Sequence, residues 1–260
     1  MRLSVSRIKA FKACRRLYEL KFLEHLEPIQ KAEALETGSN YHQMLEFLNK
    51  NGIDAFKQEY EGDFSKEHAM ATAYSKHIYP QFKVIDAERW LEVETINGDK
   101  LVGIVDAIAD DGHIVEHKTT GSEITEAYEY NLQWDEQILA YMYMTGNRKV
   151  HYTVCRKPTI RQKQSETEEE FYNRMLEWYE TDTDSKIRLL EIERTDDEVA
   201  RFEDDLLMIA DDMRHAGNFY RNTCHCNAWG RRCEYSSICL NYDPNQECVE
   251  FVKGADYEPT

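Results

Sequence analysis

Apolar residues in the first third of the chain recur every three or four positions, which is the spacing of one face of a helix. The pattern starts after Ser4 or Ser6, either of which can cap a helix running to about residue 23. A second helix is predicted between the pairs Thr37-Gly38 and Asn51-Gly52, and a third over residues 65–87. The chain is therefore predicted to begin with a helical region.

The period then changes to two, the alternation expected of strands. Asn97-Gly98 is typical of a tight hairpin turn, and Asp110-Asp111-Gly112 marks a second turn. Three strands are predicted over residues 90–96, 101–109 and 113–119, and together they form a meander. Further predicted elements are a helix over 132–144, a strand over 150–156, a helix over 165–181, a strand over 186–193 and a helix over 196–216. This order favours an α/β core flanked by helices.

The length of 260 residues is enough to bury one substantial core, so a single domain over residues 1–260 is expected. No stretch approaches the roughly 18 consecutive apolar residues of a membrane span. The first residues, MRLSVSRIKAFKACRR, lack the apolar core of a signal peptide. We therefore expect a cytoplasmic location and no membrane partner.

The net charge is −17, from 32 basic and 49 acidic residues, and a field of that sign repels phosphate on average. The basic residues are unevenly spread, however. Residues 1–24 carry seven Lys and Arg against two Glu, and the segment between Met213 and Cys233 has four Arg and no acid. Two basic stretches in an acidic chain indicate a local anionic partner, although scattered surface charge would give a similar pattern.

Two carboxylates and a lysine fall on the second and third predicted strands. Asp106 closes the run Gly103-Ile-Val-Asp, and Glu116 and Lys118 follow Val115. Alternation along a strand puts Glu116 and Lys118 on one face. Carboxylates on neighbouring strands supply the oxygen ligands that Mg²⁺ and Mn²⁺ prefer, and such an ion can activate water against a phosphodiester. Lys118 would then be a positive partner for the water or the phosphate.

The same three residues could instead form a strand-end acid and an ordinary exposed ion pair, because a short Asp…Glu-X-Lys match has little specificity. The neighbouring residues argue against this reading. The segments 103–105 and 114–115 are mostly apolar, so the charges lie on strands predicted to be buried. An unpaired carboxylate is costly in such a place.

The Gly-X-X-Asp and Glu-X-Lys runs resemble two motifs of the PD-(D/E)XK nuclease superfamily, specifically its RecB-like branch. Gly38-Ser-Asn-Tyr-His42 is similar to that branch's Gly-X-X-X-His helix, and Gln137-Ile-Leu-Ala-Tyr141 to its Gln-X-X-X-Tyr helix. The proline of the superfamily's name is absent before Asp106. The resemblance implies a restriction-endonuclease-like fold, a mixed sheet flanked by helices, with its catalytic core over residues 38–160. It also implies metal ligands at His42, Asp106, Glu116 and the His117 carbonyl, and catalytic roles for Asp106, Glu116, Lys118, Gln137 and Tyr141.

Four of the seven cysteines lie within residues 224–239, which indicates a metal site more than a disulfide framework. Thiolates suit zinc or an iron–sulfur cluster. The spacing Cys226-X₆-Cys233-X₅-Cys239 lacks the two Cys-X₂₋₄-Cys knuckles typical of structural zinc. From the residues alone, a fourth ligand has to come from Cys224, His225 or a distant position.

RecB-like nucleases with iron–sulfur clusters, such as the AddB subunit and the CRISPR-associated exonucleases, take one cysteine from the N-terminal helix and three from the C-terminus. The segment FKACRRLY around Cys14 resembles the first of these regions, and the tail resembles that of phage-encoded members. The resemblance implies a 4Fe–4S cluster in a region formed by residues 1–30 and 214–245. Its ligands would be Cys14, Cys226, Cys233 and Cys239.

Zinc held by Cys224 together with the three tail cysteines is the alternative, and it leaves Cys14 as a core residue. Cys155 and Cys248 are expected to be spare thiols. An iron–sulfur cluster would also bring the two basic stretches together at a DNA-binding surface. The basic residues assigned to that surface are Arg15, Arg16, Arg221, Arg231 and Arg232.

The expected function is that of a Mg²⁺- or Mn²⁺-dependent DNA exonuclease acting on single-stranded ends in recombination, repair or DNA processing. A helicase or recombination partner is compatible with it, and a prokaryotic or phage-infected cell is the expected setting. The alternative is a catalytically quiet DNA-binding accessory subunit of a helicase or integration complex. The complete set of His42, Asp106, Glu116 and Lys118 argues against that alternative.

Overall fold

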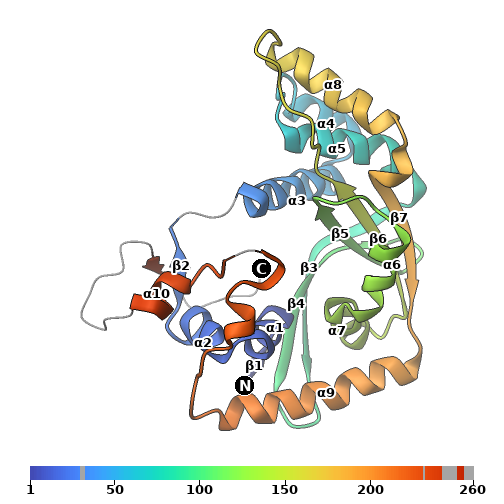
Figure 1. Ribbon diagram of the computed structural model, residues 1–260. Coiled ribbons are helices and arrows are strands. Elements are labelled where there is room, and N and C mark those ends of the chain that lie inside the picture. The colour runs from blue at the N-terminus through green and yellow to red at the C-terminus, as the bar shows by residue number, and fades with distance from the viewer. Residues whose placement is uncertain (30–32, 231, 242–250, 255–260) are drawn as a thin grey trace. The chain divides into compact units, whose positions relative to one another are not determined.

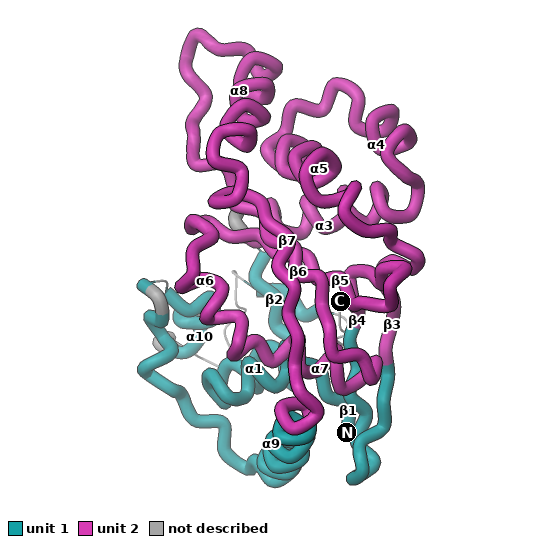
Figure 2. The backbone as a smooth tube through the Cα atoms, turned by 90° about the vertical axis from the view of Figure 1, so that its right-hand side faces the viewer, with its two compact units in different colours: residues 1–32, 92–103, 200–260 teal, residues 33–91, 104–199 magenta. Residues whose placement is uncertain are grey.

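The computed structural model describes residues 1–29, 33–230, 232–241 and 251–254. Arg231 and Cys248, which the sequence predictions include, lie outside the described residues. The chain divides into two compact units, shown in different colours in Figure 2. Unit 1 comprises residues 1–32, 92–103 and 200–260, and unit 2 comprises residues 33–91 and 104–199.

Unit 1 contains both ends of the chain. Its first predicted helix is broken at Cys14, whose backbone is extended at φ −163° and ψ 118°, so a single helix to residue 23 was wrong. A second short helix covers Arg15–Tyr18, and a π-helix over Glu19–Leu23 follows it. The elements are β1 (Arg2–Leu3), α1 (Val5–Ala13), α2 (Arg15–Tyr18), β2 (Leu26–Pro28), α10 (Ser236–Asn241), β8 (Phe251–Lys253) and most of α9 (Asp196–His215).

Two pairings join distant parts of unit 1. Strand β2 pairs antiparallel with β8, and β1 pairs parallel with the start of β4. The Asn222 side chain donates to the Ala13 carbonyl at 2.8 Å, and the Arg16 N–H donates to the Tyr220 carbonyl at 3.2 Å. The N-terminal helices and the segment after α9 therefore lie side by side.

Unit 2 holds most of the sheet and the helices around it. Its elements are α3 (Glu33–Asn51), α4 (Ile53–Glu59), α5 (Lys66–His77), β5 (Ile114–Thr120), α6 (Glu126–Asn131), α7 (Glu136–Thr145), β6 (Lys149–Arg156), α8 (Glu168–Glu180) and β7 (Ile187–Glu193). Strands β3 (Val84–Glu94) and β4 (Lys100–Ala109) each have residues in both units.

The sheet confirms the predicted meander, and β1, β6 and β7 join it to make six strands among the described residues. Strand β3 pairs with β4, and β4 pairs antiparallel with β5. The sheet continues with β6 parallel to β5 and β7 antiparallel to β6. A mixed sheet flanked by helices is thus confirmed as the fold.

Helices cover both faces of the sheet in unit 2, with α3 and α7 on opposite sides of the strands (Figure 1). Strand β6 has six consecutive buried residues, 150–155, as expected for a strand covered on both faces. One core cluster joins Tyr41 and Leu45 of α3 with Tyr74 of α5, Cys155 of β6 and Tyr179 of α8.

The helix predicted over residues 65–87 was too long. It begins after Ser65, whose side chain caps it, and ends at His77. Pro80 lies in a 3₁₀ turn just beyond, where its ring cannot continue an α-helix, and β3 begins at Val84. Among the described residues, no helix has both the length and the apolar content needed to cross a membrane.

Candidate active site

The carboxylate of Asp106 lies between strands β4 and β5. The two strands pair at Ala107 with Val115 and at Ile108 with Ile114. One residue further along, Oδ2 of Asp106 accepts the backbone N–H of His117 at 2.6 Å. The Asp106 side chain thus accepts a backbone N–H of β5, the kind of group that usually bonds to a neighbouring strand. This hydrogen bond fixes the carboxylate at the point where the two strands separate.

Glu116 and Lys118 lie on one face of β5, as the alternation predicted. The Lys118 ammonium donates to Oε1 of Glu116, and the Glu116 side chain is almost completely buried. Its second oxygen, Oε2, is buried without a hydrogen-bond partner among the described residues. A buried carboxylate oxygen without a partner is costly and indicates a missing cation or donor.

Helix α7 holds Lys118 from the other side. The Lys118 ammonium donates to Oε1 of Gln137 at 2.9 Å, and Nε2 of Gln137 donates to the Tyr141 hydroxyl at 2.8 Å. The Tyr141 hydroxyl donates in turn to the backbone carbonyl of Ile104, two residues before Asp106. This chain of hydrogen bonds links the lysine of β5 to the strand that carries Asp106. Gln137 and Tyr141 are one helical turn apart, so they share one face of α7.

Two histidines complete the group on the α3 side. Nδ1 of His42, on α3, lies 3.4 Å from Oδ1 of Asp106. The His117 ring is buried, with Nδ1 2.6 Å from the Thr153 hydroxyl and Nε2 3.5 Å from the Asn49 amide nitrogen. In a strand the N–H and C=O of one residue point to the same side. Because the His117 N–H faces Asp106, its carbonyl faces the same gap.

The electrostatics of Asp106 and His42 favour the charged forms of both. Burial alone would raise the pKa of Asp106, but the attraction and hydrogen bond of His42 outweigh it and hold that pKa well below its ordinary value. Burial would lower the pKa of His42, and the Asp106 charge raises it above its ordinary value. Burial lowers the pKa of His117 to about 4, so this histidine is neutral.

Glu116 and Lys118 are shifted in the same direction for different reasons. Burial and the neighbouring Asp106 charge raise the pKa of Glu116 to about 7. Burial opposes the charge on Lys118, but the carboxylates of Glu116 and Asp106 raise its pKa above the ordinary value. Lys118 is therefore a permanent cation, whereas the Glu116 carboxylate needs further positive charge to remain ionised at neutral pH.

Glu88 on β3 also belongs to this group, and the sequence patterns did not single it out. Burial first, and the Asp106 charge second, raise the pKa of Glu88 to about 7. Its backbone has φ +54°, uncommon for a residue with a side chain. The only signal in the sequence was an acid just before a predicted strand, and such acids are frequent.

A family model described as the PD-(D/E)XK nuclease superfamily matches residues 2–240. The chain belongs to this superfamily. Membership of the RecB-like branch is not part of that match. Nucleases of the PD-(D/E)XK superfamily use divalent metal ions, in keeping with the paired carboxylates of β4 and β5.

Solved structures match the chain at low sequence identity, and the fold likeness rests on the first of them. A candidate exonuclease from Eubacterium rectale has a TM-score of 0.52 and 14% identity, with 92% of each chain covered. An alkaline exonuclease from Laribacter hongkongensis has a TM-score of 0.38 and 14% identity, covering 82% of this chain and 88% of its own. A phage-related exonuclease from Haemophilus somnus has a TM-score of 0.36 and 16% identity, covering 71% and 86%. None of the curated proteins matches the chain significantly.

Five of the six described cysteines of this superfamily member lie in unit 1. Cys14 is buried, and the backbone N–H of Asn222 donates to its sulfur at 3.2 Å. The pKa of Cys239 is raised by burial, and the nearby sulfurs of Cys14 and Cys226 raise it further. The pKa of Cys233 is raised by burial and, to a smaller degree, by Cys239 and Cys226. The sulfur of Cys239 therefore lies within electrostatic range of the sulfurs of Cys14, Cys226 and Cys233.

Cys224 and Cys155 differ from those four cysteines. Cys224 is exposed, although it lies in the same turn as Cys226. Cys155 lies in the core of unit 2, where burial raises its pKa to about 12.

The four described arginines among those assigned to DNA contact have partners within the protein. Arg16 pairs with Glu19 and with Glu24 at 3.1 Å. Arg15 stacks over the Phe11 ring at 4.4 Å and lies 3.7 Å from Asp212. Arg221 donates to the Cys239 carbonyl at 2.8 Å, and Arg232 donates to the Ser236 hydroxyl at 2.6 Å. Arg221 and Arg232 are exposed, whereas Arg15 and Arg16 are half-buried.

Proposed function

We propose that the protein is a metal-dependent DNA exonuclease that hydrolyses phosphodiester bonds at the ends of single-stranded DNA. One observation carries the proposal. Asp106 and Glu116 lie beside a lysine held in place by α7, and one buried oxygen of Glu116 has no hydrogen-bond partner among the described residues. Superfamily membership supports nuclease chemistry, and the Eubacterium rectale exonuclease supports action at ends through its name.

The residues present fit a divalent cation. Oε2 of Glu116 has no hydrogen-bond partner among the described residues, and burial together with the Asp106 charge raises the pKa of Glu116, so added positive charge would favour its ionised form. Oxygen ligands with one imidazole suit Mg²⁺ or Mn²⁺. The ligands would be His42, Asp106, Glu116 and the His117 carbonyl. When bound there, such an ion supplies a polarised phosphate oxygen and a more acidic water.

The chain's own groups define the remaining chemistry. Lys118 stays protonated, so it can stabilise negative charge on a phosphate but cannot act as the general base. Gln137 accepts a hydrogen bond from Lys118, and Tyr141 fixes Gln137, so the pair positions the ammonium without needing to touch the reacting atoms. A positioned cation of this kind mainly stabilises the transition state of the reaction.

An iron–sulfur cluster on Cys14, Cys226, Cys233 and Cys239 is part of the proposal. Its support is the gathering of these sulfurs from the two ends of the chain. Thiolates are the ligands that such clusters use. The cluster would hold the two basic stretches of unit 1 together, and Arg221 and Arg232 would remain exposed for DNA backbone contacts.

The experiment is anaerobic incubation of the purified protein with end-labelled linear single-stranded DNA and with circular single-stranded DNA. Each substrate is tested with Mn²⁺ and with EDTA. The expected result is loss of the linear strand only, and only with Mn²⁺. Asp106→Asn and Lys118→Met should each slow the reaction by at least about 100-fold, because the first weakens a metal ligand and the second removes a positive charge at the reacting phosphate.

Asp110→Asn is the matched control. Asp110 is an exposed acid in the turn that follows β4, and its loss should leave the rate unchanged. Cleavage of the circular substrate would show an endonuclease and overturn the specificity for ends. Full activity of Asp106→Asn would overturn the site, and DNA binding without cleavage by the wild-type protein would favour the accessory-subunit alternative.

A further inference from the structure

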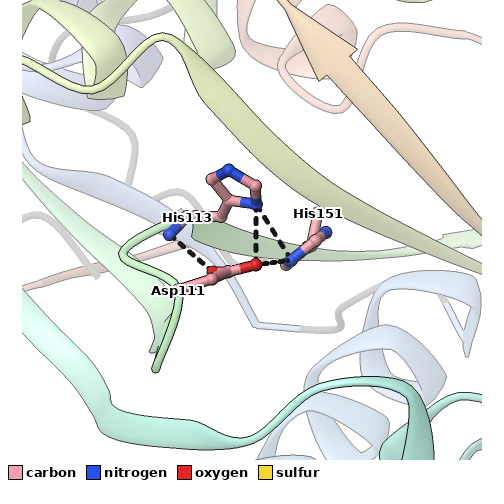
Figure 3. A group of neighbouring side chains, drawn as sticks. All are labelled: Asp111, His113 and His151. Carbon is pink, nitrogen blue, oxygen red and sulfur yellow. Dashed lines mark hydrogen bonds and ion pairs between the residues drawn. The ribbon is translucent and has the colours of Figure 1, made fainter.

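A group of one carboxylate and two imidazole side chains lies at the turn between β4 and β5, outside the carboxylate site. Asp111 is in the turn, His113 directly precedes β5, and His151 is on β6 (Figure 3). Glu116 is three residues beyond His113 on β5, which corresponds to about 10 Å along a strand. The two groups of ligands are therefore distinct.

The three potential ligand atoms, one from each side chain, lie close to one another. Oδ2 of Asp111 lies 2.9 Å from Nδ1 of His113 and 2.8 Å from Nε2 of His151. The two imidazole nitrogens are 3.1 Å apart. Ligands about 2.1 Å from one ion are about 3.0 Å apart at the right angles of an octahedral site and about 3.4 Å apart at the tetrahedral angle of a structural zinc site. The triangle in Figure 3 thus has the size of one face of a metal coordination shell.

Hydrogen bonds among these three side chains alone would leave some of their polar atoms poorly paired. If both imidazoles donate to the same carboxylate oxygen, their two N–H groups face each other at 3.1 Å. If one imidazole donates to the other instead, the carboxylate loses a donor. A cation in the centre would accept lone pairs from all three atoms at once.

The positions of these side chains are set by the fold, independently of any ion. The His151 ring is buried and stacks on Phe82, with ring centres 5.0 Å apart and planes 13° apart. Its other nitrogen, Nδ1, is buried without a partner among the described residues. Asp111 is also held, because its Oδ1 accepts the His113 backbone N–H at 2.9 Å. The Asn147 side chain donates to the Gly112 carbonyl and fixes the turn itself.

We propose that Asp111, His113 and His151 form a second metal site, selective for zinc-class transition-metal ions over Mg²⁺. Two imidazoles and one carboxylate are a ligand set that such ions prefer, whereas Mg²⁺ prefers oxygen ligands. The ion would fasten the β4–β5 turn to β6 and so stabilise the sheet. This site does not depend on the proposed nuclease activity.

The test compares zinc binding by the full-length wild-type protein, Asp111→Asn, His113→Gln and the double variant. Equilibrium dialysis is done against Zn²⁺ with Mg²⁺ in excess, so that the oxygen-rich site is occupied by the harder ion. The cysteines are the same in all proteins, so their contribution cancels. His151 is left unchanged because it is buried, whereas the side chains of Asp111 and His113 are 42% and 23% exposed.

The double variant is expected to bind about one zinc ion fewer per chain than the wild type, and each single variant to bind at least about tenfold more weakly. Zinc should raise the melting temperature of the wild type more than that of the double variant. Asp110→Asn removes the same charge from the same turn but no ligand, and it should bind zinc like the wild type. Equal zinc content and equal melting shifts in all the proteins would overturn the site. Circular dichroism checks that the variants are folded.

Discussion

At the scale of single residues, the candidate active site depends on buried charges that lack full compensation. Asp106 is compensated by His42 and by a backbone N–H, and its pKa is low. Glu116 and Glu88 are less well compensated, and burial raises the pKa of each to about 7. The Asp106 charge acts on both Glu116 and Glu88, so added positive charge favours the ionised forms of all three carboxylates.

Glu88 provides a prediction at this scale. Glu88→Gln should weaken Mn²⁺ activation and lower the cleavage rate, by about 10-fold, because it removes one carboxylate that attracts the cation but is less buried than Glu116. The measurement is the cleavage rate as a function of Mn²⁺ concentration. Asp86→Asn, an exposed acid two residues earlier on the same strand, is the matched control. An unchanged Mn²⁺ dependence in Glu88→Gln would remove Glu88 from the site.

The sequence predicted the side chains of this site where they follow local patterns. Asp106, Glu116 and Lys118 lie on adjacent strands, and alternation alone put the last two on one face. Glu88 was missed because its place depends on an irregular backbone with φ +54°, which no residue pattern marks. The group of Asp111, His113 and His151 was missed because His151 is nearly forty residues away, on a parallel strand.

At the scale of elements, local periodicity predicted most strand bounds closely, but β3 begins at Val84, six residues before its predicted start. Strand β4 runs over Lys100–Ala109 against a predicted 101–109, and β5 over Ile114–Thr120 against 113–119. The short elements were missed. Strand β1 has two residues and depends on pairing with β4, almost a hundred residues later, and α4 and α6 have seven and six residues. Such elements are stabilised by tertiary contacts, which local patterns do not encode.

Helix α8 is fastened to the loop before it by one ion pair. The Arg174 guanidinium donates to both oxygens of Glu166, at 2.6 and 2.7 Å, and also to the Arg161 carbonyl at 2.8 Å. The hydrogen bonds from Arg174 to the carboxylate, together with one from the Lys163 backbone N–H, lower the pKa of Glu166 to about 2. A carboxyl whose pKa is lower in the folded state stabilises the fold above its unfolded pKa, and this contribution is lost as the pH falls toward the folded value.

A pH-dependent prediction follows for the ion pair. Arg174→Gln should lower the free energy of unfolding at pH 7, and its deficit relative to the wild type should shrink as the pH falls below about 4.5, the ordinary pKa of Glu. Urea unfolding at pH 7 and at pH 3.5 measures the difference. Arg201→Gln, an exposed arginine of α9, controls for the loss of charge. A deficit that stays constant with pH would show that Arg174 acts through packing and not through Glu166.

At the scale of the whole molecule, unit 1 is built from the two ends of the chain. Strand β2 pairs with β8, and Cys14 lies against Asn222, more than two hundred residues later. Contacts this distant in sequence are entropically costly to form in an unfolded chain. A cluster that ties the ends together would offset much of that cost, as covalent loop closure does.

The last prediction concerns the cysteines. Cys14→Ala, Cys226→Ala, Cys233→Ala and Cys239→Ala should each lose iron and acid-labile sulfide. Each should also lower the free energy of unfolding, on the order of 4 kcal/mol if the cluster acts like a covalent closure of a long loop. Metal analysis of anaerobically purified protein and urea unfolding measure the two effects.

Cys224→Ala and Cys155→Ala are the matched controls, because Cys224 is exposed and Cys155 lies in the core of the other unit. Both should keep their iron. Zinc in place of iron, lost in Cys224→Ala and retained in Cys14→Ala, would instead identify a zinc site built from the tail alone. In that case the two ends of the chain would be joined by β2, β8 and the contacts of Asn222 without a shared metal, and the stability of unit 1 would not depend on Cys14.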